Sequence, residues 1–344
     1  MIHISESMEK KKLFELDYLR ALAILLVIFS HIDNFAKSQF IETYDYYFAI
    51  IGLTIFFFIS GYLLQYNDRI KSKKEISIFL KKKVIRIYPL YCVSILCSLI
   101  LFGYLSLDSE IVKPFNLNIS YINILIHLTG LQGFFPQFHM PGLWFIGIIF
   151  LYYISYSIIV YFSKNNQELV MYSILFLFIF FVLKIKYNII SMDFFRYYLV
   201  FLIGALSCAL TIGNDNKGSF FKKSKLISFI SESSYSIYLF HLQILTVVKL
   251  CLNSLDLSQS AEGLLLVLLG IPIVIIFSYY IQRLCIRTTK NKKYDTNVNS
   301  QIKEISTLGK ERTTKRIIIS FSLTVSIVLV IFFDLTLSII SKFV

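Results

Sequence analysis

Apolar residues fall in long runs along the whole chain, separated by short polar stretches. The runs cover about 13–33, 45–66, 84–107, 119–135, 142–162, 168–185, 193–213, 229–250, 262–285 and 316–341. Most of them approach the roughly 20 residues that an α-helix needs to cross the hydrocarbon core of a bilayer. Runs this numerous leave no room for a soluble domain between them. The pattern therefore predicts an all-α fold, a polytopic transmembrane helical bundle of about ten membrane segments.

The polar stretches divide the chain into three parts. Residues 1–285 are expected to form the membrane core. Residues 286–315 are rich in Lys, Asn, Ser and Thr, and such a composition cannot bury enough apolar surface to fold, so we expect a polar cytoplasmic linker. Residues 316–344 contain the last apolar run and are expected to form the final transmembrane helix.

Composition and charge agree with a membrane protein. Of the 344 residues, 56% are hydrophobic and 16% are charged, whereas soluble domains have about 45–50% and about 25%. The net charge is +13, but the basic residues lie in short loops between apolar runs, which is typical of cytoplasmic loops and argues against nucleic acid as a partner. All 5 cysteines lie in apolar runs or directly at their ends and none forms a Cys-x-x-Cys pair, so we expect no metal site.

Loop charges also predict the orientation. The N-terminus, the loop around 69–83, the loop around 217–225 and the stretch after 285 are all basic, and all four are expected in the cytoplasm. These placements need an even number of crossings before residue 213, but seven runs precede it. The run 119–135 is the shortest and contains His127, so we expect it to be re-entrant rather than a full span. The first run follows basic residues like a signal peptide, but it lacks a small-residue cleavage site, so we expect a retained signal anchor.

Two ionisable residues of the first run, Arg20 and His31, carry the clearest chemical signal, because such groups are costly in lipid. At 100° per residue His31 returns to within about 20° of Arg20, roughly 16 Å further along the helix, so both face the same wall of the bundle. A cation below an imidazole suits a reaction with an anionic donor and a proton to remove. Equally, Arg20 can snorkel to the interface or pair with Asp17, and His31 can simply end the span.

The second and third runs contain further polar groups. Ser60 and Gly61 interrupt an aromatic stretch, where they allow either close helix packing or the approach of a ligand. Lys83 and Arg86 lie at the start of the third run. Side chains of this type bind phosphate groups, although anchoring on the cytoplasmic side explains the lysine equally well.

In the eighth run Tyr235, Tyr238 and His241 are spaced by three and form one slanting polar stripe on a helix. The tyrosines also fit an interfacial aromatic belt, but His241 lies too deep for one. Four other isolated polar residues are interpreted as helix-end or packing residues, namely His127, His139, Arg196 and Asp334.

Taken in order, five motifs resemble the acyltransferase-3 family of integral membrane acyltransferases. They are Arg20-x10-His31, Phe-Phe-x-x-Ser-Gly-Tyr-Leu at 56–63, basic-x-x-Arg-Ile-x-Pro at 83–89, Leu143-Trp144-Phe145, and Ser-Tyr-Ser-x-Tyr-Leu-x-His at 234–241. Their order and spacing agree from residue 13 to about 285. The resemblance implies a bundle that moves an acyl group, usually acetyl from acetyl-CoA, onto a hydroxyl of a glycan at or across the membrane.

The resemblance also implies roles for individual residues. Arg20 and His31 match the functional pair of the family and are expected to be catalytic. Lys83 and Arg86 match its basic pair and are expected to bind the donor, but a lysine in the first place disfavours a bidentate phosphate contact there. The acceptor side is expected to contain Ser60, Gly61, Trp144, Tyr235, Tyr238 and His241.

Two departures concern carboxylates. Where many family members have a Glu after the Leu-Trp pair, this chain has Ile149 or Phe150, and where they have an Asp before the Phe-Phe pair it has Thr54. A mechanism with a carboxylate beside His31 is therefore not supported. His31 acts as a general base or carries the acetyl group transiently, and both routes stay open.

The resulting expectation is an acyl-CoA-dependent O-acyltransferase of a bacterial cytoplasmic (inner) membrane, with its N-terminus in the cytoplasm. Its acceptor is a surface polysaccharide or a lipid-linked precursor, such as O-antigen, capsule or exopolysaccharide. Its partners are acetyl-CoA, the glycan acceptor and membrane lipid, with no permanently bound cofactor. The alternative is a membrane transporter or polysaccharide-export component without acyl transfer, in which buried charges and many spans are equally natural.

Overall fold

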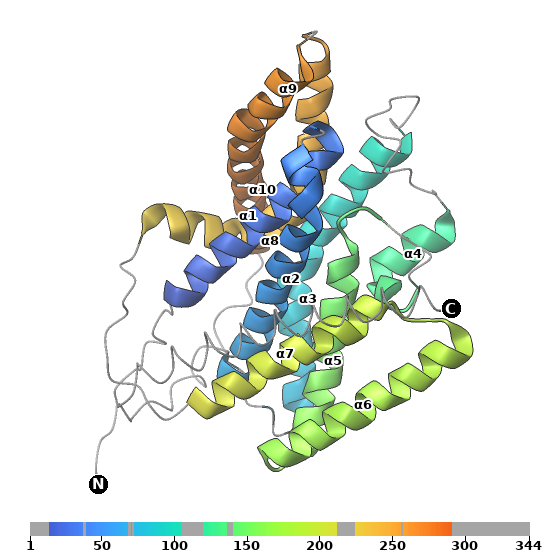
Figure 1. Cartoon of the computed structure of the whole chain (residues 1–344). Coiled ribbons are helices and arrows are strands. Elements are labelled where there is room, and N and C mark those ends of the chain that lie inside the picture. The colour runs from blue at the N-terminus through green and yellow to red at the C-terminus, as the bar shows by residue number, and fades with distance from the viewer. Residues whose placement is uncertain are drawn as a thin grey trace.

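The computed structural model describes residues 14–36, 39–67, 70, 72–104, 120–135, 140–211, 224–255 and 257–290, and this part of the chain contains no strand. Figure 1 shows the arrangement of its helices. In chain order they are α1 (Phe14–Ala36), α2 (Gln39–Asn67), α3 (Lys73–Ser98) with a π-helical end (Leu99–Tyr104), α4 (Tyr121–Thr129) with a 3-10 turn (Leu131–Gly133), α5 (Trp144–Phe162), α6 (Asn166–Tyr187), α7 (Met192–Thr211), α8 (Lys225–Asn253), α9 (Gln259–Leu265), a π-helical turn (Leu266–Gly270) and α10 (Ile271–Lys290). The predicted all-α fold is confirmed.

Six helical segments within the described residues are long and apolar enough to cross a membrane: Tyr44–Gln65, Lys73–Gly103, Trp144–Phe162, Asn166–Tyr187, Lys225–Asn253 and Ser260–Cys285. Each overlaps one predicted run, while α1 and α7 overlap the runs predicted at 13–33 and 193–213. The protein is therefore a multi-pass membrane protein. The predicted last span, 316–341, lies outside the described residues, and so does the predicted linker from residue 291 on.

The run 119–135 forms a short helix and a turn rather than one helix of membrane length, and its re-entrant course stays a prediction. Its helix α4 has 9 residues, which at 1.5 Å per residue is about 14 Å long, half of the roughly 30 Å hydrocarbon core. The sequence itself sets both ends: the Ser120 side chain accepts a hydrogen bond from the Asn123 amide (3.1 Å), and Gly130 ends the helix at φ 73°, a left-handed conformation that favours glycine.

Hydrogen bonds fix α4 and the following turn against α3 and α5. Tyr91 Oη donates to the His127 carbonyl at 3.0 Å. Gln132 Nε2 donates to Tyr91 Oη at 2.8 Å and to the Leu143 carbonyl at 3.2 Å. His127 is thus a packing residue, as the sequence indicated, and the turn that it supports leads toward the start of α5 at Trp144.

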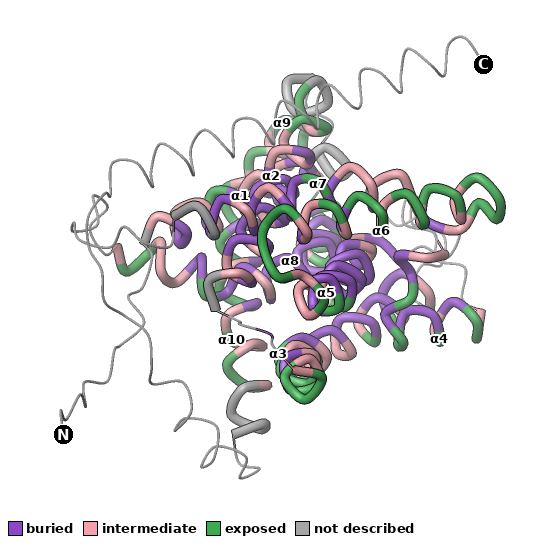
Figure 2. The backbone as a smooth tube through the Cα atoms, turned by 90° about the horizontal axis from the view of Figure 1, so that it is seen from below, coloured by how far each residue is buried: buried purple, intermediate pink, exposed green. Residues whose placement is uncertain are grey.

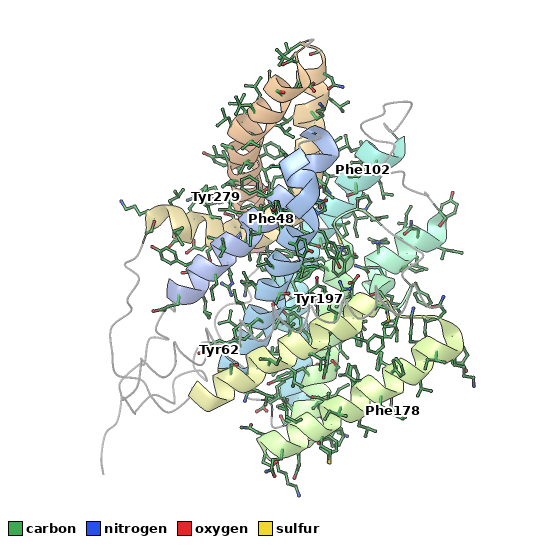
Figure 3. All side chains as sticks on the ribbon, viewed as in Figure 1. Phe48, Tyr62, Phe102, Phe178, Tyr197 and Tyr279 are labelled. Atoms are coloured by element: carbon green, nitrogen blue, oxygen red, sulfur yellow. The ribbon has the colours of Figure 1, made fainter. Side chains whose placement is uncertain are left out.

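The helices differ in how far they are buried, and the outer helix α6 exposes apolar side chains. Figure 2 shows α5 and α8 largely buried and α6 largely exposed. The exposed side chains of α6 are apolar, for example Phe178, which is 62% exposed and labelled in Figure 3, whereas Tyr197 of α7 is 2% exposed. A helix that satisfies its own backbone hydrogen bonds and exposes apolar side chains is expected to face lipid tails, which cannot hydrogen-bond, rather than water.

Helices α2 and α7 pack with their backbones almost in contact. A Cβ atom added to Gly61 would lie 1.9 Å from the Phe201 carbonyl oxygen, and one added to Gly204 would lie 2.2 Å from the Phe58 carbonyl oxygen. Only glycine fits at both points, a known means of tight helix packing in membranes. Of the two interpretations of the Ser60-Gly61 pair, close helix packing describes Gly61.

Candidate active site

Two predicted site residues from distant parts of the chain, His31 and His241, lie side by side. Helices α1 and α8 pack together, and the centroids of the two imidazole rings are 5.1 Å apart with a tilt of 38° between their planes. His31 is half-buried, whereas His241 is 1% exposed. The expected catalytic residue and one expected acceptor-side residue therefore share one site.

His241 is held in a defined orientation by its own helix. Its Nδ1 lies 2.7 Å from the Tyr238 carbonyl oxygen, and because a carbonyl only accepts hydrogen bonds, Nδ1 carries a proton. The Tyr238 ring lies 5.8 Å from the His241 ring and 5.0 Å from the Phe145 ring, between centroids. The predicted stripe on α8 thus brings Tyr238 and His241 to the same place.

Arg20 lies on α1 about 16 Å below His31 along the helix axis, in a separate polar cluster. Its Nη1 is 4.0 Å from Asp17 Oδ1, and its side chain is 27% exposed. The Ser231 hydroxyl of α8 donates to the same Asp17 oxygen at 2.8 Å. Pairing with Asp17, one of the two alternatives to a functional role, is therefore present, and α8 holds the carboxylate that positions Arg20.

Arg86 of α3 lies near Arg20, and Lys83 of α3 is connected to Arg20 through Tyr153 of α5. The Arg86 guanidinium lies close enough to repel that of Arg20, and Tyr153 of α5 also acts on Arg20 electrostatically. The Lys83 ammonium lies 4.8 Å from the centroid of the Tyr153 ring, a favourable cation–π distance. Asp17 brings one negative charge to Arg20, against the three positive charges of Arg20, Lys83 and Arg86, so this basic cluster suits a phosphate-bearing ligand.

Tyr235 lies by the basic cluster rather than by the histidines. Its hydroxyl donates to the Ile87 carbonyl of α3 at 2.8 Å, directly beside Arg86 in the sequence. This bond connects α8 to α3 at the level of the basic cluster. The stripe of three residues on α8 is therefore divided, with Tyr235 on the cationic side and Tyr238 and His241 at the histidine pair.

A series of aromatic rings connects Trp144 to the histidine pair. Its ring is 6.2 Å from that of Tyr197, which stacks 4.7 Å from Phe57. Phe57 in turn lies 4.7 Å from Phe145, which contacts Tyr238. Of the other residues expected on the acceptor side, Gly61 packs against α7, and Ser60 is half-buried on α2.

Sequence reasoning missed the residues that connect these groups. Ser231 gave no signal, because its bond to Asp17 depends on the packing of α1 against α8. Arg196, interpreted as a helix-end residue, pairs with Asp193 at 3.2 Å and lies 6.0 Å from the centre of the Tyr197 ring. It is a helix-end residue that also packs by the aromatic rings near Trp144.

The fold and the site thus define a class of protein: a multi-pass helical membrane protein that has a histidine pair and, about 16 Å away along α1, a basic cluster. The family model of the acyltransferase-3 family, described as an acyltransferase domain, matches residues 13–206 and 174–283. The chain belongs to this family and is a membrane acyltransferase. No curated protein and no solved structure matches it significantly. The matched residues include both clusters.

Proposed function

We propose that this acyltransferase moves acetyl from acetyl-CoA to a hydroxyl of a cell-surface polysaccharide, or of its lipid-linked precursor, in a bacterial cytoplasmic membrane. The observation that carries the proposal is the presence of two different chemistries on one helix. Arg20 of α1 belongs to a basic cluster with Arg86, and His31 of α1 belongs to an imidazole pair with His241. A charged donor and a hydroxyl acceptor need both.

The basic cluster supports a phosphate-bearing donor. Guanidinium groups bind phosphate through paired, charge-assisted hydrogen bonds, and an ammonium adds a point charge. Arg20 and Arg86 would hold the phosphates of acetyl-CoA, with Lys83 as an additional cation. Because Arg20 and His31 face one wall about 16 Å apart along α1, a donor bound at the cluster would extend its thioester toward His31.

The histidine pair supports the transfer itself. The acceptor oxygen attacks the thioester carbonyl carbon, a C–O bond forms, the C–S bond breaks, and CoA leaves as a thiol once it has received the proton lost by the hydroxyl. In this direct route His31 would remove the hydroxyl proton as a general base. Alternatively, a ring nitrogen of His31 would attack the thioester first, and the N–H proton of His31 would go to the leaving thiolate. The acetyl group would then pass to the acceptor, and the hydroxyl proton would return to His31. Both routes give the same products.

Acetyl transfer is tested by labelling. Membranes of the cells that encode the protein, given [14C]acetyl-CoA, are expected to incorporate base-labile label into the cells' own surface polysaccharide, and membranes from a strain lacking the protein are not. Base treatment matters because it cleaves O-acetyl esters and leaves N-acetyl groups in place. Equal labelling of the two strains, or movement of a saccharide across the membrane without any acetyl label, would favour the transporter alternative.

Replacing Arg20 with alanine is expected to raise the KM for acetyl-CoA about tenfold to a hundredfold, since a charge-assisted hydrogen bond contributes about 1.5–3 kcal/mol. The saturation curve of [14C]acetyl transfer in membranes measures this change. Arg283→Ala is the matched control, because Arg283 is exposed on α10 and donates to Tyr279 of its own helix at 2.9 Å. Unchanged saturation in Arg20→Ala would remove Arg20 from donor binding.

A further inference from the structure

The surroundings of His241 prepare its side chain to accept a proton, which is more than a residue that only lines the acceptor side would need. Three observations concern this one side chain: it is 1% exposed, its Nδ1 lies 2.7 Å from the Tyr238 carbonyl, and its Nε2 is buried with no hydrogen-bond partner among the described residues. A buried polar atom without a partner is costly, so its retention points to a ligand.

The Tyr238 contact decides which nitrogen can accept a proton. A neutral imidazole has one N–H and one lone pair. Because Nδ1 must donate to the Tyr238 carbonyl, the lone pair of neutral His241 lies on Nε2. The α8 backbone thus sets the tautomer, without the carboxylate that orients histidine in many hydrolases.

The neighbourhood of His241 separates it from an ordinary core histidine. His127 makes a similar contact, with Nδ1 2.9 Å from the Asn123 carbonyl, and is fully buried on α4. His241 differs because the His31 ring lies 5.1 Å from its own. The described residues hold no group of three or more His, Cys, Asp or Glu side chains that would bind a metal ion, so a proton-transfer pair describes these two rings better than a metal centre.

We propose that Nε2 of His241, in place of His31, is the general base that takes the proton of the acceptor hydroxyl, and that His31 is the second member of a proton relay. This inference rests on the proposed acetyl transfer. As the acceptor oxygen attacks the thioester carbon, its proton moves to Nε2 of His241, the C–O bond forms and the C–S bond breaks. The proton passes from His241 to His31 and from there to the departing thiolate, which leaves both rings neutral. If His31 carries the acetyl group, His241 takes the same proton while the bond to His31 breaks, and His31 then recovers it.

The test compares variants in the membrane assay with [14C]acetyl-CoA and the cells' own surface polysaccharide. His241→Gln keeps a hydrogen-bonding side chain that does not take up a proton. Its maximal rate is expected to fall at least about 100-fold, the lower end of what a general base contributes, with an unchanged KM for acetyl-CoA. In His241→Ala membranes, added imidazole is expected to restore transfer in a concentration-dependent way. His127→Gln is the matched control and is expected to keep wild-type transfer.

Either of two results overturns the proposal. One is a His241→Gln rate above a tenth of the wild-type rate. The other is a loss of transfer in His241→Ala that no concentration of imidazole restores, which would assign His241 a packing role. Failure of acetyl transfer as such looks different, because wild-type membranes would then label no polysaccharide at all.

Discussion

Replacing His31 with alanine is expected to reduce the O-acetyl content of the surface polysaccharide to that of cells without the protein. Both proposed routes for the transfer need the imidazole, either as a proton carrier or as the nitrogen that takes the acetyl group, and a general acid or base contributes about 10²–10⁴-fold to a rate. The helix itself should persist, because His31 is half-buried on α1 and alanine is the best helix former. Base-labile acetate released from purified polysaccharide measures the effect.

The control for this experiment lies one residue away. The Ser30 hydroxyl donates only to the Val27 carbonyl of its own helix, at 2.8 Å, in the described structure, so Ser30→Ala should leave acetylation at the wild-type level. Immunodetection of both variants in membranes separates loss of chemistry from loss of protein. Wild-type acetyl content in cells that contain the His31→Ala protein would show that the catalytic assignment is wrong.

Much of the fold follows from sequence patterns that act locally. Apolar runs near membrane length became helices, and the run at 119–135 was short enough to indicate an incomplete segment, where the structure has a helix of 9 residues. The common face of Arg20 and His31 followed from helix geometry alone. Each of these inferences needs only one segment of chain.

What could not be predicted depends on how helices meet. Nothing in the first run shows that His31 lies beside His241, because that contact requires α1 to pack on α8 in one particular register. The same packing brings Ser231 to Asp17. The position of Tyr235 is similar, since its place by Arg86 depends on the bond to the Ile87 carbonyl of α3. The spacing by three predicted that Tyr235 and His241 belong to one stripe. It could not predict that they have different neighbours on other helices.

The neighbour of Gly61 is another feature that the sequence could not predict, because it depends on how α2 packs. The sequence allowed either a ligand or a helix next to it, and only the structure shows the backbone of α7 there. The complementary glycine, Gly204, is on the other helix, and each faces a carbonyl oxygen of its partner. A pair of this kind is invisible in one sequence, because each glycine by itself is common in membrane helices.

Replacing Gly61 with alanine is therefore expected to have the largest effect on stability. The new Cβ would lie 1.9 Å from the Phe201 carbonyl oxygen, and a helix backbone cannot rotate away as a flexible side chain can. Overpacking costs about 1–3 kcal/mol and sometimes more, and a clash with backbone belongs at the upper end of that range. The detergent-purified protein is heated, and the amount that still elutes as a folded particle is measured at each temperature. The variant should show a clearly lower midpoint and a smaller folded fraction.

Gly270→Ala is the matched control for this effect. The nearest neighbour of the Cβ added at Gly270 would be Leu245 Cδ2 at 3.3 Å, a terminal methyl that can shift by a few tenths of an ångström. The thermal midpoint should therefore stay near that of the wild type. Gly204→Ala should behave like Gly61→Ala, because it forces apart the same two helices. If Gly61→Ala melts with the control instead, α2 and α7 are not in backbone contact. If it melts early, acetylation should fall with the folded fraction although Gly61 takes no part in the chemistry, because α2 also carries Phe57 of the ring series between Trp144 and the histidine pair.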